Sequence, residues 1–427
     1  MDPETMTEAV SIPAESTASI RLGRWWQLTL GVICMSMIAN LQYGWTLFVN
    51  PIHDTHGWSV AAIQVAFSVF VLVETWLVPI EGYLVDKFGP RYVGVVAGVL
   101  VALAWIINSA AHSLPMLYLG AVVGGVGAGA VYGACVGNAL KWFPDRRGLA
   151  AGITAMGFGA GSALTVFPIA NMIKSSGYEA TFFNFGIAQG AVVFVVSWFL
   201  RAPGANFSAP RPAATRTPAT ARTREYTPFE MLATPAFWVM FIMFVLTAVG
   251  GLIATAQLTP MAKDFGISNS TVSMLGVTTL ALPFALSLNR VLNGVSRPFF
   301  GWVSDVLGRE RTMFVAFAIE GVVILLLTQF GRNPIGFVVF TGLLFFAYGE
   351  IYSLFPAICG DTYGRKFASA NAGLLYVAKG VASLVVPLAS LIAASSAGWN
   401  GVFIAAAGMN FVAAILAIAV LKPLRAR

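Results

Sequence analysis

Long apolar runs recur along this chain, each about 20 residues in length and ended by glycine, proline or charged residues. A helix needs about 20 apolar residues to cross the hydrocarbon core of a bilayer, which is ~30 Å thick. Hydrophobic residues make up 58% of the sequence and charged residues only 10%, too few to cover a water-facing surface. The sequence therefore predicts an all-α membrane protein whose first partner is the lipid bilayer.

We expect twelve membrane-spanning helices, six on each side of a polar segment rich in Pro, Ala, Thr and Arg. This segment, Ala202–Thr227, has no apolar periodicity and is typical of a hydrophilic linker. The spans are expected near residues 25–50, 60–84, 92–111, 115–140, 147–173, 178–201, 236–259, 272–302, 312–329, 334–360, 368–394 and 398–421. The predicted organisation is a tail (1–24), a six-helix bundle (25–201), a linker (202–235), a second six-helix bundle (236–421) and a tail (422–427).

Most of the 25 Lys and Arg residues fall in the two tails, the linker and the loops on one side of the membrane. The opposite loops hold only Lys174, Lys263 and Arg332. Since cytoplasmic loops are enriched in Lys and Arg, we expect a multi-pass protein of the cytoplasmic (inner) membrane of a bacterium, with both termini cytoplasmic. The net charge of +7 is then a topology signal, and no nucleic-acid partner is expected. The polar N-terminal residues do not form a cleavable signal peptide.

One motif appears twice at a constant spacing, once after the second expected span and once after the eighth. Basic pairs after spans four and ten repeat at the same spacing, which indicates duplicated halves. Glycines at both ends of the motif allow a tight turn and close helix approach. Its aspartate is able to meet a helix N-terminus or an arginine, and would so latch the cytoplasmic mouth. The motif residues are Gly82, Asp86, Gly89 and Arg91 in the first half and Gly301, Asp305, Gly308 and Arg309 in the second.

This duplicated motif resembles the signature loop of the major facilitator superfamily, which has a weaker copy in its second half. The resemblance covers essentially the whole chain. It implies the major facilitator fold, in which two pseudo-symmetric six-helix bundles rock about a central cavity.

Several ionisable residues are expected at membrane depth, where a charge is costly unless it faces a cavity or a partner. The cations are Arg290 and Arg297 on span eight, two helical turns apart and on one face, and Lys379 on span eleven. Together, Arg297 and Lys379 would suit a small anion, because a guanidinium matches a carboxylate bidentately and an ammonium acts as a point charge. The alternative is that glutamates cancel each cation, with Glu320 or Glu350 as partners of Arg290. The carboxylates at this depth are Glu74, Glu81, Glu320 and Glu350.

Polar and aromatic residues of spans one, four, five, eight and ten form a second candidate set, because a buried tyrosine hydroxyl needs a partner that a cavity supplies. Singly, such residues are as often packing or interface residues; as a set at midplane depth they look like cavity walls. The set comprises Gln42, Tyr43, Tyr132, Phe158, Asn293, Tyr348 and Tyr352.

The stretches around these residues resemble the oxalate/formate antiporter family, a neighbour of the monocarboxylate transporters. They include Gln42-Tyr43-Gly-Trp45, Asn293-Gly-Val-Ser-Arg297-Pro-Phe-Phe-Gly-Trp302 and Tyr348-Gly-Glu350-Ile-Tyr352. The resemblance implies that Arg297 and Lys379 bind the substrate carboxylates and that the aromatic set lines the pocket. The chain departs from that family at Phe158 and Tyr348, and in carrying charges at Glu74, Glu350 and Arg290.

We expect a secondary active transporter of small organic carboxylate anions that works by alternating access. Proton-coupled symport of a monocarboxylate such as lactate or pyruvate is the alternative, with protons as a second partner carried on Glu74 or Glu350; Asn293, where many monocarboxylate carriers have aspartate, counts mildly against it. A transporter-like sensor is a third hypothesis. No enzyme is expected, because no Cys, His and Asp cluster has nucleophile–base or metal-ligand spacing. No cofactor or metal is expected either, and we expect a monomer.

Overall fold

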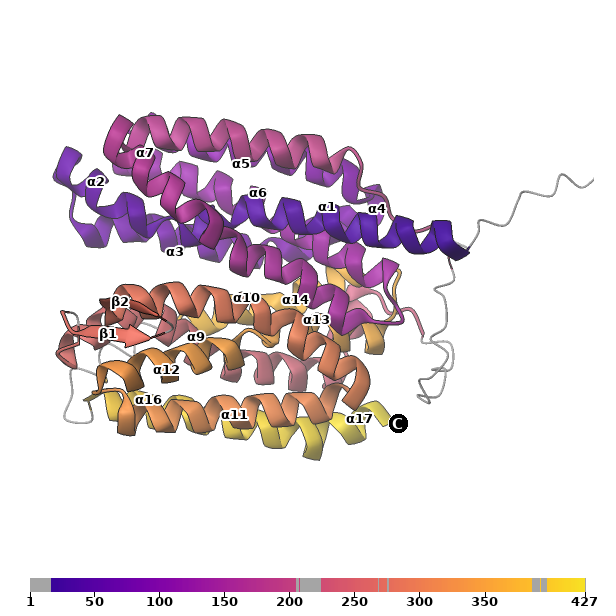
Figure 1. Ribbon diagram of the computed structural model, residues 1–427. Coiled ribbons are helices and arrows are strands. Elements are labelled where there is room, and N and C mark those ends of the chain that lie inside the picture. The colour runs from indigo at the N-terminus through magenta and orange to yellow at the C-terminus, as the bar shows by residue number, and fades with distance from the viewer. Residues whose placement is uncertain are drawn as a thin grey trace, which may run out of the picture.

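A computed structural model describes residues 17–204, 207, 224–267, 269–274, 276–385, 392 and 398–426. Figure 1 shows two bundles of long helices side by side, the first from the N-terminal part of the chain and the second from the C-terminal part. The first contains α1 (Thr17–Tyr43), α2 (Thr46–His56), α3 (Val60–Trp76), α4 (Val78–Phe88), α5 (Pro90–Ser109), α6 (Leu114–Trp142) and α7 (Arg147–Ser197). The second contains α9 (Pro235–Asp264), α10 (Ala281–Leu307), α11 (Arg309–Phe330), α12 (Pro334–Tyr348), α13 (Ile351–Tyr363), α14 (Ala368–Ser383) and α16 (Gly398–Leu416), followed by the π-helix η1 (Ala417–Leu421) and α17 (Lys422–Ala426).

Within the described residues, each expected span corresponds to a helix, a bent helix pair or part of α7. Residues 386–391 and 393–394 of the expected span at 368–394, and residues 1–16 of the expected N-terminal tail, lie outside the described residues. Span one is α1 and α2, bent by 48° near Gly44, and span two is α3 and α4, bent by 44° at Leu77. Pro79 near the start of α4 explains the second bend, because it has no N–H to bond back into α3. Spans five and six are continuous in α7 apart from Gly177, whose φ of 82° reverses the chain. The two-bundle fold expected from the sequence is confirmed.

Apolar length alone identifies fewer spans than the fold contains. Seven helices among the described residues are long and apolar enough to cross a membrane, or nine when each bent pair is taken as one span. The remaining expected spans include α10 and α14, which carry Arg290, Arg297 and Lys379. These helices face the other bundle and not lipid alone, so their polar residues lower the mean hydropathy without placing charge in hydrocarbon.

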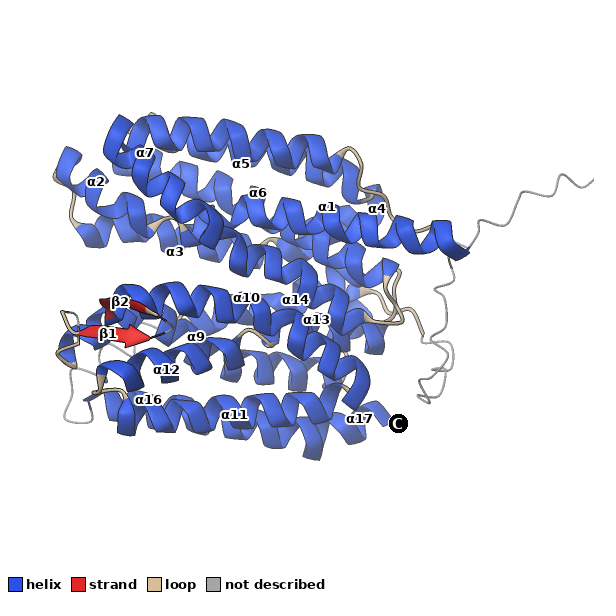
Figure 2. Cartoon of the chain, in the orientation of Figure 1, coloured by secondary structure: helices blue, strands red, loops and turns tan. Residues whose placement is uncertain are grey.

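The expected span at 272–302 is wrong in its first residues, which form a β-hairpin. Strands β1 (Thr271–Met274) and β2 (Val277–Leu280) pair antiparallel, with Gly276 in the turn at a φ of 77°. The run is rich in threonine and valine, which favour strands, and polar and apolar residues alternate in β1 but not in β2. Figure 2 shows this hairpin at the end of the bundles opposite the C terminus. Helix α10 therefore begins only at Ala281.

The expected linker at 202–235 is described only at its ends. Residues 205, 206 and 208–223 lie outside the described residues, and Pro228–Leu232 forms the short helix α8. Thr227 and Glu230 close the start of α8 with a reciprocal capping box. The N–H and hydroxyl of Thr227, with the nearby Arg224, hold the pKa of Glu230 below its ordinary value.

Glycines set the contact between the two bundles at the end where the chain termini lie. A Cβ on Gly301 of α10 would overlap the carbonyl oxygen of Gly148 in α7, and one on Gly82 of α4 would lie 2.5 Å from the carbonyl oxygen of Ser369 in α14. Only the absence of a side chain permits this backbone contact. The glycines of the duplicated motif thus hold the first half against the second.

Replacing Gly301 by alanine is expected to separate α10 from α7 and to destabilise the protein by about 1–3 kcal/mol, as overpacking does elsewhere. The melting temperature of the purified variant measures this loss. Gly408→Ala in α16 is the matched control, since a Cβ there meets no atom within 4 Å. Equal melting temperatures of the two variants would show that α7 and α10 pack less closely than they do in the structure.

Candidate functional site

The cations expected at membrane depth lie on α10 and α14, the helices of the second bundle that pack against α7 and α4 of the first. Arg297 and Lys379 are only 0% and 1% exposed, and Arg290 is half-buried. The Cζ of Arg297 lies 4.2 Å and the Nζ of Lys379 lies 5.9 Å from the ring centroid of Tyr352. The structure thus gathers Arg297 and Lys379 around one aromatic ring at the seam between the bundles.

Lys379 is paired with a carboxylate from the other bundle. Its Nζ lies 3.2 Å from Oε2 of Glu74 on α3 and donates to the hydroxyl of Tyr376 at 2.8 Å. That hydroxyl donates to Oε1 of Glu74 at 3.3 Å, so the three groups form a closed triangle. Glu74 is 0% exposed, and an ion pair shielded from water in this way is little screened by salt. The alternative in which a glutamate cancels the cation therefore holds for Lys379.

Arg297 has no carboxylate partner among the described residues. Its Nη1 donates to the carbonyl oxygen of Ala155 on α7 and its Nη2 to Oδ1 of Asn293, both at 2.8 Å, while its buried Nε has no hydrogen-bond partner. Its bonded acceptors are therefore neutral. A buried guanidinium bonded only to neutral acceptors keeps a full positive charge at the seam.

Two small features of the surroundings fix the position of this guanidinium. The amide nitrogen of Asn293 donates to the carbonyl oxygen of Phe345 at 3.1 Å, which turns the amide oxygen toward Arg297. On the other side lies Gly159 of α7, where a Cβ would stand 3.0 Å from the Cζ of Arg297. The glycine-rich stretch of α7 therefore makes room for the arginine head.

Arg290 is not paired with Glu320 or Glu350, and this expected alternative is wrong. Its Cζ lies 4.4 Å above the ring of Tyr43, across the seam between the bundles, and among the described residues it makes no ion pair. The reason is the direction of the two glutamates, which point into the second bundle. A cation over an aromatic face is stabilised only modestly, and no carboxylate among the described residues neutralises Arg290.

Glu320 of α11 and Glu350, between α12 and α13, lie close to each other, and Asn410 of α16 lies beside Glu320. None of the four carboxyl oxygens has a hydrogen-bond partner among the described residues. Both carboxyl groups are 0% exposed. No cation lies within ion-pairing distance of them in the described part of the chain. This pair therefore lies apart from the cations of the seam. Two adjacent buried carboxylates repel each other strongly when both are charged.

The expected aromatic residues surround Arg297 and Lys379 on both sides of the seam. Centroids of Phe158 and Tyr43 are 5.3 Å apart, and Phe158 and Tyr132 are 6.4 Å apart. On the second bundle, the hydroxyls of Tyr348 and Tyr352 share a hydrogen bond of 2.9 Å. Gln42 is buried with its Oε1 unpartnered. The structure therefore places residues of α1, α6, α7, α12 and α13 about one region.

Sequence reasoning missed Tyr376, which links Lys379 to Glu74 and stacks on Tyr132 with a centroid distance of 4.4 Å. Its spacing of three residues from Lys379 was an available signal, because residues three apart share a helix face. The roles of the Ala155 carbonyl and of Gly159 could not be predicted in this way. One is a backbone group and the other depends on a missing side chain, and residue type reveals neither.

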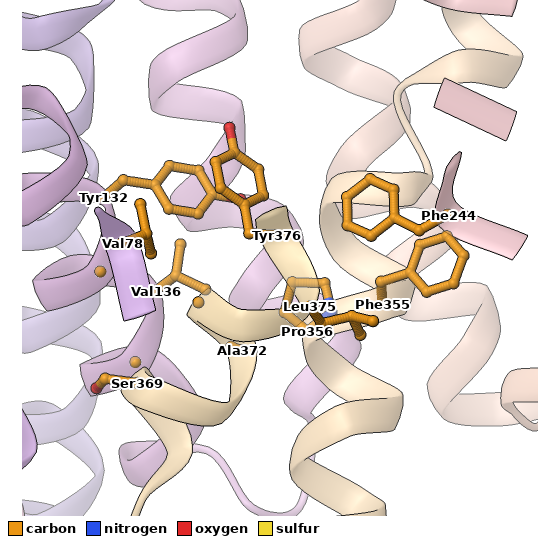
Figure 3. Close-up of a pocket in the computed structure, with 13 residues that line it drawn as sticks. Val78, Tyr132, Val136, Phe244, Phe355, Pro356, Ser369, Ala372, Leu375 and Tyr376 are labelled. Atoms are coloured by element: carbon orange, nitrogen blue, oxygen red, sulfur yellow. The ribbon is translucent and has the colours of Figure 1, made fainter. Parts of the chain in front are cut away.

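A small apolar pocket adjoins this region where α6, α13 and α14 meet. Figure 3 shows it between the stacked rings of Tyr132 and Tyr376 on one side and Phe244 and Phe355 on the other, with Ser369 at its edge. Its lining carries no charged side chain. The pocket therefore does not suit an anion.

The two motif aspartates each reach a helix N-terminus of the opposite bundle. Asp86 accepts from the backbone N–H of Ala370 at 2.9 Å, at the start of α14. Asp305 accepts from the N–H groups of Gly148 and Leu149 at 3.0 and 2.8 Å, at the start of α7. A carboxylate is stabilised by the positive end of a helix. Burial raises the pKa of Asp305, and Arg309 together with these N–H donors acts in the opposite direction.

Other motif residues complete this contact at the termini end. Arg309 pairs with Asp305 and with Asp361 of α13, and Asp361 also pairs with Arg147 of the first bundle, each of the last two at 2.7 Å. Asp361 therefore ties the halves together through Arg147, while its pair with Arg309 lies within the second bundle. The remaining motif glycines end α4 and α10 at positive φ, and Arg91 makes no ion pair among the described residues. These glycines are Gly89 (φ 88°) and Gly308 (φ 92°).

Comparison with known proteins places this arrangement in a family. The sequence model described as Major Facilitator Superfamily matches residues 28–288 and 239–427. An oxalate:formate antiporter of Oxalobacter formigenes is 35% identical over 395 residues, which cover 92% of this chain and 90% of the relative. Monocarboxylate transporter 12-B of Danio rerio is 24% identical and covers 72% of this chain and 68% of the relative.

The fold has a counterpart among solved structures. The crystal structure of the Major Facilitator Superfamily transporter FucP in the outward conformation superposes with a TM-score of 0.66, at 13% identity and over 92% of this chain and 97% of that one. At this identity the likeness concerns the fold.

Removing one member of the Lys379–Glu74 pair is expected to destabilise the protein strongly. Lys379→Met leaves a buried carboxylate without a partner, which costs about 3–5 kcal/mol. The double variant Lys379→Met with Glu74→Gln removes both charges and is expected to recover most of this loss. Melting temperatures of the wild type, Lys379→Met, Glu74→Gln and the double variant form a double-mutant cycle, with Lys263→Met at an exposed position as control. Additive effects would mean that the two groups do not interact.

Proposed function

The chain belongs to the Major Facilitator Superfamily, and on that premise we propose that it is a secondary carrier of small carboxylate anions. The observation that carries the proposal is Arg297, a fully buried cation at the seam of the two bundles whose bonded acceptors are all neutral. In a carrier, a buried charge of this kind is expected to be neutralised by a substrate anion that binds and dissociates. The name of the 35% identical relative, an oxalate:formate antiporter, supports carboxylates as that counter-ion.

The geometry suits a carboxylate. A guanidinium presents a planar fork that matches the two oxygens of a carboxylate, and its unpartnered Nε leaves a donor free on one edge. The ring of Tyr352, 4.2 Å from the Cζ of Arg297, helps to exclude water around the guanidinium, which strengthens the attraction. Since Ala155 and Phe158 belong to the first bundle and Arg297 to the second, binding would draw the halves together.

Alternating access requires that the cavity open at one end at a time. The contacts of Asp86, Asp305 and Asp361 close the seam at the termini end, which we assign to the cytoplasm because Lys and Arg gather there. The structure then corresponds to a carrier closed toward the cytoplasm, and the anion enters from the hairpin side. Release inward requires these aspartates to leave their helix N-termini. The protein so proposed lies in the inner membrane of a bacterium.

A second candidate is proton-coupled symport of a monocarboxylate. It is favoured by the buried carboxyl pair of Glu320 and Glu350. Among the described residues no cation lies within ion-pairing distance of this pair, which so provides a site where a proton can bind. Coupling would require protonation of this pair, or of Glu74, to change the contact between the bundles.

The test is uptake of labelled oxalate and of labelled L-lactate into proteoliposomes, with and without an inward proton gradient. Arg297→Gln is expected to lower uptake at least about 100-fold, because two charge-assisted hydrogen bonds contribute about 3 kcal/mol or more. The control is Arg332→Gln, because the side chain of Arg332 packs over Phe265, away from the seam. Normal uptake by the Arg297 variant would refute the assignment. Uptake that depends on the proton gradient would indicate symport, and uptake that is independent of it would indicate exchange.

A further inference from the structure

Glu74 stands where a substrate carboxylate would be expected to stand. Its two oxygens lie 3.2 Å from the Nζ of Lys379 and 3.3 Å from the hydroxyl of Tyr376, and it reaches them from the first bundle across the seam. Glu74 and Lys379 are 0% and 1% exposed. The ammonium is therefore already neutralised before any ligand arrives.

The charge that remains at the seam is that of Arg297, with Arg290 farther along the same helix. A second carboxylate brought to Lys379 would share one ammonium with Glu74, and two carboxylates repel strongly where water is absent. A small dianion that bridged Arg297 and Lys379 would therefore have to displace Glu74, leaving that group buried and unpaired.

Arg290 does not substitute for Lys379 in holding a small dianion. It is seven residues from Arg297, about 10 Å along the helix at 1.5 Å per residue, and its head lies over Tyr43. The two carboxyl carbons of oxalate are directly bonded to each other, so oxalate cannot span that distance. A longer dianion with separated carboxylates would be required.

We propose that Glu74 is a resident counter-ion of Lys379, so that the carrier takes small anions bearing one carboxylate and discriminates against oxalate. This inference rests on the proposed carboxylate-carrier function and specifies the substrate class of the same site. Arg297 binds the single carboxylate, and Glu74 occupies the place of the second. Glu74 is then a specificity-determining residue.

The test measures binding of formate, acetate, L-lactate, oxalate and glutarate to the purified full-length carrier at pH 7.5, by the rise in melting temperature with ligand concentration. In the wild type, acetate or lactate is expected to bind at least tenfold more tightly than oxalate. In Glu74→Gln, the affinity for oxalate relative to acetate is expected to rise at least tenfold, because Lys379 becomes free. Glu81→Gln is the matched control: this buried glutamate on α4 has no cation partner among the described residues, and its ligand preference should equal that of the wild type.

A wild type that prefers oxalate, or an unchanged oxalate-to-acetate ratio in Glu74→Gln, would overturn the inference while leaving the carrier function intact. Preference for glutarate would overturn it too, since Arg290 would then be the second cation. Should Glu74→Gln fail to fold, the charge-balanced double variant Glu74→Gln with Lys379→Met is expected to keep the preference for acetate over oxalate. Loss of that preference in the folded double variant would count against the proposal. Absence of binding by every carboxylate, or binding unaffected by Arg297→Gln, would instead refute the carrier function itself.

Discussion

The requirement that every charge in a bilayer be compensated from within the protein governs this structure. Lys379 meets it through Glu74 and Tyr376, and Arg297 meets it only in part, through the neutral oxygens of Ala155 and Asn293. Both arrangements, a cation paired with a carboxylate and a cation bonded to neutral oxygens, occur at the seam between the bundles. There, residues of either bundle can reach a cation of the second bundle. The proposed anion site rests on this difference, since Lys379 is neutralised by a carboxylate and Arg297 is not.

Close backbone contact and buried charge depend on each other here. The contact of Gly148 with Gly301, and of Gly82 with Ser369, lets Asp305 and Asp86 reach the helix N-termini of the opposite bundle. These contacts close one end of the seam, while the Lys379–Glu74 pair joins the halves nearer its middle. Opening toward the termini end therefore has to break several helix-terminus contacts together, which is the behaviour of an element with two discrete arrangements.

The sequence was sufficient for features set by local composition, such as the spans, the duplicated halves and the positions of Arg297 and Lys379. It was insufficient where the answer depends on which distant helices meet. Glu74 and Lys379 are far apart in the chain, and nothing local decides that α3 faces α14 while Glu320 lies beside Glu350 and Asn410. For the same reason the expected partner of Arg290 was wrong. The hairpin at Thr271–Leu280 was taken as helix because a short apolar run does not reveal its period.

The most direct measurement is an experimental structure of the carrier in lipid nanodiscs with saturating acetate. We expect density for a carboxylate against the guanidinium of Arg297, beside Tyr352 and Phe158, with the Lys379–Glu74 pair still intact. Density for the anion on Lys379 with Glu74 turned away, or no anion between the bundles, would contradict it.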